Sequence, residues 1–358
     1  MNKSKTAFIT SLVSSALLSV SAMSFAGSWN TETISGMNVH IYTPTTTPAR
    51  NSKRALMINL HGCAQTNTDL KNGGNWKATA DKYGMVVAIP GAPGGGVIAG
   101  CWDYYGTSQT RSNKYNDNLI GLANTLKGRS ALNIDSKQVY ISGLSSGSSQ
   151  SMVIGCLAPE IFAGLGLNAG PTIGTSSSQI GSVQTNLTAA KNLCNSWAGS
   201  LKSHFSTQIT SAVYGSSDYL VAQGYNQLNV DVMKGVGNTL GWNKKVTGMG
   251  HEWPAGGGPG GSYINNSLYN YPDALTDWLC KNNKRAAGTC PVGGGGVQLL
   301  LRQPQQQRLL LAACIVVAPL TLTITTATAQ FVTVPHLGKI TQHADLTNGW
   351  VMQAITNA

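Results

Sequence analysis

Short apolar runs alternate with amphipathic stretches along most of this chain. Residues 55–60 and 85–90 are almost entirely apolar, as in strands buried on both faces of a parallel sheet. Further strands are predicted at residues 33–42, 138–141, 162–170, 209–214 and 243–247. Helical patterns lie between them, at residues 76–83, 116–126, 148–157, 187–201, 222–236 and 271–280. This alternation predicts an α/β fold with a mostly parallel sheet and helices on both faces.

The first 26 residues have the layout of a secretory signal. Lys3 and Lys5 precede an apolar stretch at residues 7–20 that is too short to span a membrane. Ser24-Phe25-Ala26 then forms a small-x-small cleavage site. We therefore expect a signal peptide at residues 1–26, an extracellular protein and a single catalytic domain at residues 27–290.

Composition and charge narrow the choice of partners. The chain has 358 residues, of which 42% are hydrophobic and 10% are charged, and its formal net charge is +11. The basic residues are scattered, and they form neither a basic helix nor a stripe interleaved with aromatic residues. A solvated basic surface is therefore expected, with no nucleic-acid partner. No stretch predicts a stable membrane span.

The tail after the Gly-rich linker at residues 293–296 has an unusual composition. Residues 297–311 consist almost entirely of Gln, Leu, Arg and Pro, whose codons can all begin with C. Read in another frame, such codons can encode threonine, so residues 291–358 are interpreted as a linker followed by a low-complexity tail that a frame shift has altered. The alternative is a genuine Gln/Leu-rich extension. No fold is predicted for this tail.

Seven cysteines suit an exported protein, because disulfides persist outside the cytoplasm. Six of them form neighbouring pairs along the sequence: Cys63 with Cys101, Cys156 with Cys194, and Cys280 with Cys290. This pairing is one of 15 possible connectivities for six cysteines. The spacings do not match a zinc site, and neither a metal nor a cofactor is expected. Cys314 is left over.

The segment Gly143-Leu144-Ser145-Ser146-Gly147 follows a predicted strand and precedes a predicted helix. In that context a G-x-S-x-G segment forms a sharp turn that exposes a nucleophilic serine. We therefore expect Ser145 to be the nucleophile and the N–H of Ser146 to face the same space. The alternative is a serine-rich turn without chemistry.

A His-Gly turn ends the buried strand at residues 55–60. It reads His61-Gly62-Cys63-Ala64-Gln65, and the N–H of Cys63 is the expected second donor of an oxyanion hole opposite that of Ser146. His61 is either a substrate-side residue or a structural turn histidine. The Gly-rich loop at residues 91–106 carries Trp102, which either contacts substrate or packs on the body.

The acid and the base of a catalytic triad are expected further along the chain. Asp218 lies just past the strand at residues 209–214, and His251 lies on the loop after the last strand. The order serine, aspartate, histidine is that of α/β-hydrolases. His204 precedes the aspartate, and the two later histidines lie in the tail. Asp231 is the alternative acid, although its pattern is helical.

Together these segments resemble the extracellular polyhydroxybutyrate depolymerases, which are secreted bacterial esterases, over residues 27 to about 290. The resemblance implies an α/β-hydrolase fold, a Ser145-Asp218-His251 triad, an oxyanion hole at Cys63 and Ser146, and substrate contacts near Trp102 and His61. It implies a serine esterase that acts on polyhydroxybutyrate or its oligomers. Apart from the resemblance, we expect the protein to be a monomer. The short tail does not resemble the family's granule-binding domain. Secreted feruloyl and acetylxylan esterases share much of the pattern and are the alternative, and a non-catalytic binding protein on the same fold is a further one.

Overall fold

The computed structural model describes residues 27–290, 332–333, 339–345 and 349–354. The chain divides into two compact units, Met1–Gly296 and Val297–Ala358, and each is described by itself. The expected signal peptide, the Gln/Leu-rich run and Cys314 lie outside the described residues. The expected domain limits therefore stay a prediction.

The first unit is built on an eight-stranded sheet with the order β1-β2-β4-β3-β5-β6-β7-β8. The strands from β3 to β8 are parallel to one another, whereas β1 and β2 join antiparallel at one edge. Their bounds are β1 (Ser28–Ile34), β2 (Met37–Thr43), β3 (Arg54–Leu60), β4 (Val86–Pro90), β5 (Ile134–Leu144), β6 (Gly164–Asn168), β7 (Ile209–Gly215) and β8 (Gly241–Val246). The mostly parallel sheet predicted from the apolar runs is confirmed.

One predicted strand is wrong in its extent. Residues 33–42 were expected to form a single strand, but they belong to the antiparallel hairpin of β1 and β2. The chain reverses at Ser35 and Gly36, whose φ angles are 49° and 76°. Two positive φ angles are what a tight two-residue hairpin turn requires. In the sequence, the apolar residues Ile34, Met37, Val39 and Ile41 continue across the turn with a shift of only one position, so the alternation shows no clear break there.

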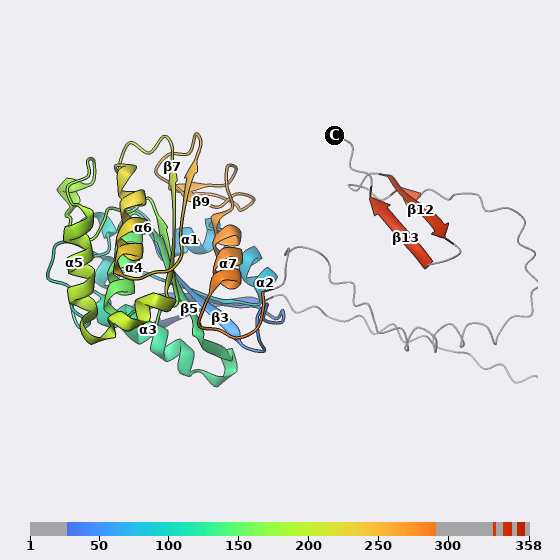
Figure 1. The fold of residues 1–358 in the computed structure, drawn as a ribbon, viewed down its shortest axis with the longest axis horizontal. Helices are drawn as coiled ribbons and strands as arrows, with labels where there is room; N and C mark the ends of the chain where they lie inside the picture. The colour runs from blue at the N-terminus through green and yellow to red at the C-terminus, as the bar shows by residue number, and fades with distance from the viewer. Residues whose placement is uncertain (1–26, 291–331, 334–338, 346–348, 355–358) are drawn as a thin grey trace, which may run out of the picture. The chain divides into compact units, whose positions relative to one another are not determined.

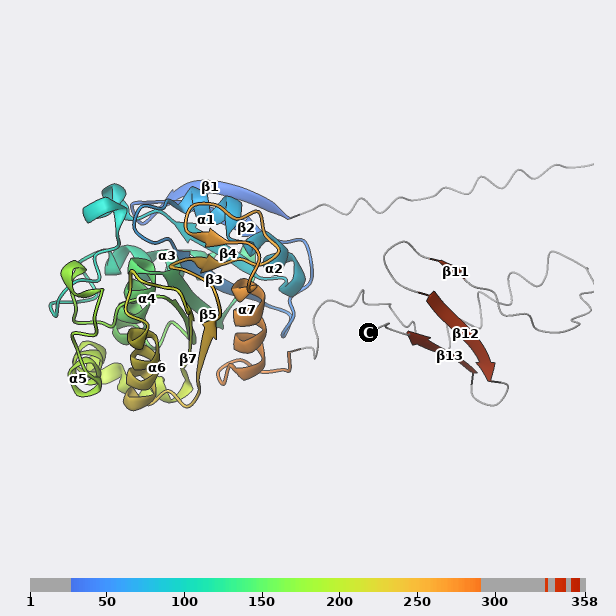
Figure 2. The ribbon, with the colours of Figure 1, turned by 90° about the horizontal axis from the view of Figure 1, so that it is seen from above.

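Helices cover both faces of the sheet (Figures 1 and 2). The helices α3, α4, α5 and α6 lie on one face, and α1, α2 and α7 lie on the other. Their bounds are α1 (Asn67–Gly73), α2 (Trp76–Tyr83), α3 (Asn116–Gly128), α4 (Ser146–Leu157), α5 (Leu187–Ala198), α6 (Gly224–Val236) and α7 (Tyr271–Asn282). Short 3₁₀ turns occur at Pro93–Gly95, Ile98–Gly100, Ser130–Leu132, Ser177–Gln179 and Gly199–Thr207.

Each face of the sheet has its own apolar core. Alternate side chains of β3 supply both: Leu56 and Ile58 pack under the α3–α6 layer, and Met57 packs under α1, α2 and α7. Successive side chains of a strand point to opposite faces, so a strand buried on both sides must be apolar throughout. This is the physical reason for the continuous apolar runs. The two cores hold the sheet rigid, and its carboxyl edge then carries the loops that contain the candidate chemistry.

Two smaller sets of strands complete the described structure. In the first unit, β9 (Trp253–Pro254) and β10 (Ile264–Asn265) pair parallel within the segment between β8 and α7. The second unit contains an antiparallel three-stranded sheet of β11 (Val332–Thr333), β12 (Lys339–Asp345) and β13 (Gly349–Ala354).

All three predicted disulfides are present in the structure: Cys63–Cys101, Cys156–Cys194 and Cys280–Cys290. The first ties the turn after β3 to the Gly-rich loop, the second joins α4 to α5, and the third fixes the segment after α7. None of the described helices has the length and hydrophobicity that a membrane crossing needs.

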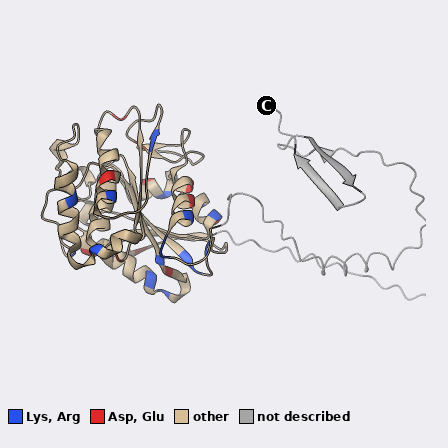
Figure 3. Cartoon of the chain, in the orientation of Figure 1, with Lys and Arg blue, Asp and Glu red and all other residues tan. Residues whose placement is uncertain are grey.

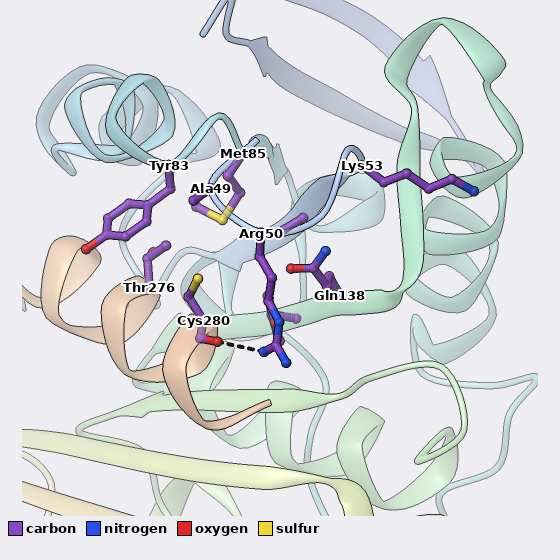
Figure 4. Close-up of a pocket in the computed structure, with 10 residues that line it drawn as sticks. Ala49, Arg50, Lys53, Tyr83, Met85, Gln138, Thr276 and Cys280 are labelled. Atoms are coloured by element: carbon purple, nitrogen blue, oxygen red, sulfur yellow. Dashed lines mark hydrogen bonds between the residues drawn. The ribbon is translucent and has the colours of Figure 1, made fainter. Parts of the chain in front are cut away.

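A small cavity lies far from the carboxyl edge, between Arg50, Tyr83, Met85 and α7 (Figure 4). Its volume of about 10 Å³ leaves room for roughly one water molecule. The Arg50 guanidinium lies beside it and donates to the carbonyl oxygens of Cys280 at 2.7 Å, Asn283 at 3.1 Å and Ala287 at 3.1 Å, and also to that of Ala286. This corner fastens the segment after α7 to the body and is too small to bind a substrate.

Candidate active site

Ser145 occupies a sharp turn between β5 and α4. Its backbone angles are φ 56° and ψ −117°, a strained conformation for a residue with a side chain. The two flanking glycines make the turn possible: a Cβ at Gly143 would lie 2.5 Å from the backbone of Gly147, and one at Gly147 would lie 2.5 Å from the carbonyl oxygen of His61. The strand–turn–helix context predicted from the sequence is confirmed, and it holds Ser145 at the carboxyl edge of the sheet.

Asp218 and His251 form a direct pair. His251 Nδ1 lies 2.8 Å from Asp218 Oδ2, and the aspartate is 4% exposed. The other carboxylate oxygen, Oδ1, accepts the N–H groups of Leu220 at 3.0 Å and Val221 at 2.9 Å. Because a carboxylate can only accept, Nδ1 of the imidazole carries the proton and Nε2 is left as the acceptor. Such a pair orients a histidine for general-base chemistry.

The loops after β7 and β8 are locked together beneath this pair. Ser217 N donates to Met249 O at 2.8 Å, and Ser216 N donates to Val246 O at 2.8 Å. A Cβ at Gly215 would lie 2.0 Å from the Met249 carbonyl oxygen, so only glycine lets the two loops approach this closely. The spacing between aspartate and histidine is therefore set by backbone contacts. The alternative acid, Asp231, lies on α6, where its carboxylate accepts from Gln227 at 2.9 Å.

The turn after β3 leaves one backbone donor open. Gly62 N donates to Gln65 Oε1 at 2.9 Å, Ala64 N to Ala99 O at 2.8 Å and Gln65 N to Gly62 O at 3.4 Å. Within residues 27–290, the N–H of Cys63 has no such partner, nor does the N–H of Ser146 at the start of α4. Buried or partly buried N–H groups are normally paired, so an open donor at a catalytic edge is available for a ligand oxygen.

Gln65 connects this turn to the loop that carries the histidine. Its side chain is 4% exposed, and while Oε1 accepts from Gly62, Nε2 donates to Ser262 O at 2.5 Å. The next residue, Tyr263, stands edge-on to the His251 ring with 6.5 Å between ring centroids. One amide side chain thus ties the two halves of the candidate site together. Gln65 belongs to the His-Gly motif, but the sequence alone gave it no role, because its partner lies almost 200 residues away.

His61 lies inside the body and has both ring nitrogens occupied. It is 3% exposed, Nε2 accepts the N–H of Ala92 at 3.2 Å, and Nδ1 lies 2.8 Å from the carbonyl oxygen of Gly62. This geometry requires a neutral ring with its proton on Nδ1. Burial lowers the pKa of His61, against smaller raising effects of the Gly62 carbonyl and Asp69. The ring therefore supports the turn and the loop after β4; a substrate contact by His61 stays a prediction.

Trp102 is fully buried, and its backbone rather than its ring reaches the elbow. Its indole packs against His61 at 5.5 Å and Tyr115 at 6.1 Å between ring centroids, with no solvent exposure. The backbone N–H of Trp102 donates to Ser146 Oγ at 3.3 Å. Of the two sequence interpretations, the described contacts match packing on the body. A direct substrate contact by Trp102 stays a prediction.

The comparisons with known proteins agree with this arrangement. A family model described as "Esterase PHB depolymerase" matches residues 38–222, which is more than half of the chain. The chain belongs to this family. The matched segment contains Ser145, the Cys63 turn and Asp218, whereas His251 lies beyond it. Membership therefore rests on the segments that the sequence analysis singled out.

Individual relatives differ in how much they share. A poly(3-hydroxybutyrate) depolymerase of Ralstonia pickettii is 40% identical over 316 residues, and the match covers 76% of this chain and 65% of that protein. Acetylxylan esterase A of Aspergillus ficuum is 29% identical over 129 residues, covering 36% of this chain and 40% of that protein. The chain thus spans less than two thirds of the length of either relative.

A solved structure confirms the fold. The acetyl xylan esterase from Aspergillus awamori superposes with a TM-score of 0.51 at 19% sequence identity, covering 63% of this chain and 94% of that chain. At this identity the likeness concerns the fold alone. With the sheet order described above, it confirms the predicted α/β-hydrolase fold.

Proposed function

We propose that this chain is a serine esterase that hydrolyses ester bonds of poly(3-hydroxybutyrate) or its oligomers. The observation that carries the proposal is the Asp218–His251 pair at 2.8 Å, placed at the same sheet edge as a serine on a strained elbow. The two open N–H donors of Cys63 and Ser146 support it, because acyl transfer needs donors where negative charge develops on the carbonyl oxygen.

The mechanism that these residues support has two halves. In the first, Ser145 Oγ attacks the ester carbonyl carbon while His251 Nε2 takes its proton, and the N–H groups of Cys63 and Ser146 bind the oxyanion. The tetrahedral intermediate collapses, and the alcohol leaves with the proton from Nε2. In the second half, water attacks the acyl-enzyme with His251 again as the base, and the acid is released. Asp218 holds the imidazole in the correct tautomer throughout.

The substrate assignment rests on the relatives and on the chemistry of the edge. The relative with the more extensive match is named for a polyester, and it is 40% identical, against 29% for the acetylxylan esterase. Poly(3-hydroxybutyrate) is uncharged, and the loops around Ser145 are almost free of charged residues. A feruloyl or acetylxylan-type carbohydrate esterase would use the same triad and is the second candidate.

Export is the second element of the proposal. Residues 1–26 have the layout of a signal peptide, and three disulfides fasten the described unit. Disulfides persist in oxidising compartments, which supports a secreted protein. We further expect the secreted protein to act as a monomer.

The first test is the substitution Ser145→Ala. It should lower the turnover of a soluble butyrate ester about 10⁴-fold or more, because the nucleophile is lost. Circular dichroism and the melting temperature should stay those of the wild type, because the side chain lies at the edge of the core. A folded Ser145→Ala protein with wild-type turnover would contradict the assignment.

A second experiment separates the two candidate substrates. Release of 3-hydroxybutyrate from soluble hydroxybutyrate oligomers is compared with release of acetate from acetylated xylan and of ferulate from feruloyl sugars. The proposal expects the oligomers to give the highest kcat/KM. A preference for either sugar ester would assign the chain to the carbohydrate esterases.

A further inference from the structure

Large apolar side chains that reach solvent are not spread evenly over the described residues. Eight are more than a third exposed: Ile98, Val183, Leu187, Tyr219, Leu220, Leu240, Tyr263 and Leu268. Six of them lie between the carboxyl end of a parallel strand and the next helix, and Leu187 is the first residue of α5, so these seven lie at the edge of the sheet that carries Ser145. The exception, Leu240, immediately precedes β8 at the opposite edge. Single exposed apolar residues are common, but grouping at one edge is not.

The two most exposed of these side chains sit on backbone that belongs to the candidate site. Tyr219 is 91% exposed and lies between Asp218 and the two residues, Leu220 and Val221, whose N–H groups donate to the Asp218 carboxylate. Ile98 is 69% exposed on the turn whose Ala99 carbonyl oxygen accepts the N–H of Ala64 at 2.8 Å, and the Cys63–Cys101 disulfide closes the same loop. The scaffold that positions the chemistry therefore also presents these side chains to solvent.

Tyr263 completes the group from the histidine side. It is 44% exposed, its ring stands against His251, and its carbonyl oxygen accepts the N–H of Trp253 at 2.7 Å. We call Ile98, Tyr219, Leu220 and Tyr263 the apolar rim. Its members come from the loops after β4, β7 and β8, so they reach the candidate site from separate directions.

The rim residues lie in stretches without charged side chains, although the chain has a net charge of +11 and Asp103, Asp218 and Glu252 occur elsewhere on the same loops. None of the segments 91–102, 170–190, 219–230 and 253–272 contains Lys, Arg, Asp or Glu. In Figure 3 most of the charged positions lie elsewhere on the body, on its helices and strands. Placing a charged group against an apolar solid costs its hydration, so a surface without charges can approach such a solid at little cost.

We infer that the apolar rim is a surface by which the catalytic unit itself adsorbs to a solid, uncharged aliphatic polyester. The inference rests on the proposed function. The ester chain offers only carbonyl and ether oxygens and short alkyl groups, which match apolar side chains and tyrosine hydroxyl donors. Because the strands that precede the rim loops, β4 on one side and β7 and β8 on the other, flank β5 in the sheet order, adsorption brings ester bonds to the edge that carries Ser145, independently of anything that the tail contributes.

The test uses the full chain and a matched control. The double variant Ile98→Ser with Tyr219→Ser removes the two most exposed members, and Leu240→Ser removes an exposed leucine at the opposite edge. Adsorption to poly(3-hydroxybutyrate) film is measured in the inactive Ser145→Ala background, so that no polymer is consumed. The partition coefficient of the double variant should fall about tenfold or more, since two apolar side chains lose their contact. That of Leu240→Ser should stay unchanged.

In the active background, the ratio of film erosion to soluble butyrate ester turnover should fall by a similar factor in the double variant. Equal adsorption by the double variant and the control would overturn the inference, as would an unchanged ratio. A change from dimer to monomer in the double variant, seen by light scattering with adsorption unaltered, would show that a second copy covers the rim. Wild-type hydrolysis of soluble hydroxybutyrate oligomers reports separately on the proposed function, so a failure there is distinguishable from a failure of the rim.

Discussion

Two buried polar clusters in this unit are each fastened by a disulfide, yet their hydrogen bonds end differently. At the Arg50 corner, beside Cys280–Cys290, the guanidinium donates to four carbonyl oxygens in the last turn of α7 and the segment after it. At the Ser145 edge, beside Cys63–Cys101, the N–H groups of Cys63 and Ser146 have no partner among the described residues. The first cluster is closed on itself, and the second leaves donors open.

The difference indicates what each cluster stabilises. A closed cluster contributes to folding, because its polar groups exchange their hydrogen bonds to water for hydrogen bonds within the protein. An open cluster gives up part of that stability and can instead stabilise charge that develops on a bound substrate. Substitutions in the two clusters should therefore affect different measurements: turnover at the Ser145 edge and the free energy of unfolding at the Arg50 corner.

The largest expected effect is on turnover and follows from Asp218→Asn. An amide at this position can donate to Nδ1 and so favour the wrong imidazole tautomer, which should lower kcat about 10⁴-fold at neutral pH. The free energy of unfolding should change far less than the activation free energy of the reaction, because the amide keeps the shape of the carboxylate. The measurement is kcat on a soluble butyrate ester together with a urea melt. The matched variant Asp231→Asn, on α6, should retain wild-type kcat.

The Arg50 corner should respond in the opposite way. Arg50→Met keeps much of the side-chain volume but leaves four carbonyl oxygens without their donor. Stranded buried acceptors of this kind should lower the free energy of unfolding by about 3–5 kcal/mol. The midpoint of urea unfolding measures this loss, while kcat per folded molecule at low temperature should be that of the wild type. A stable Arg50→Met protein with impaired kcat would erase the contrast between the clusters.

Gln65 tests whether the open cluster depends on positioning. Gln65→Met removes both hydrogen bonds of the side chain, to Gly62 and to Ser262. If they hold the Cys63 N–H in place, kcat should fall about 10–100-fold with little change in KM, which is less than the 10²–10³-fold cost of losing an oxyanion donor outright.

The matched control for Gln65 is Gln208→Met. Gln208 is also buried, and it donates to Gly155 O at 3.2 Å and Phe162 O at 3.0 Å, just before β7 begins. Its loss should lower stability and leave kcat unchanged. Gln65→Glu keeps an acceptor for Gly62 but cannot donate to Ser262, so a kcat between those of the wild type and Gln65→Met is expected. Equal losses of kcat in Gln65→Met and Gln208→Met would mean that Gln65 has only a structural role.

The two clusters were not equally visible in the sequence. Ser145 and Asp218 each follow a strand with a strong apolar pattern, so their shared edge could be predicted from strand order. His251 follows β8, which is mostly polar, and it could be predicted only from its place after the aspartate in the chain. The Arg50 corner could not be predicted, because its bonds join residues more than 200 positions apart and use backbone carbonyls that have no sequence signature. The bond between Gln65 and the carbonyl oxygen of Ser262 spans 197 positions and was equally invisible in the sequence.

Local signals were also overlooked. Helix α1 is short, but Thr66 and Asp69 form a capping box at its start, which is a pattern that a sequence can show. The hairpin of β1 and β2 was read as one strand because Ser35 and Gly36 interrupt the alternation for only two residues. The orientation of the Trp102 ring could not be predicted from the sequence either: the loop around it is tied down on both sides, by Cys101 and by the Ser146 hydroxyl, and the ring turns inward.

The smallest expected effect concerns His61, which belongs to the Ser145 edge but is itself fully paired. Burial lowers the pKa of His61 in the folded state, whereas in the unfolded chain it returns to about 6.5. Below that pH the unfolded chain binds a proton that the folded protein refuses, so the free energy of unfolding should fall by up to about 1.4 kcal/mol per pH unit until the folded pKa is reached. Burial also lowers the pKa of His40, which adds to the slope in the same direction.

Urea melts between pH 7.5 and 5 measure this slope. The free energy of unfolding of His61→Gln should fall less steeply than that of the wild type, whereas the exposed-site control His204→Gln should show the wild-type slope. If His61→Gln showed the wild-type slope, the folded protein would not be holding the His61 ring neutral. The hydrogen bonds of the ring to Ala92 and Gly62 would then not fix its protonation state.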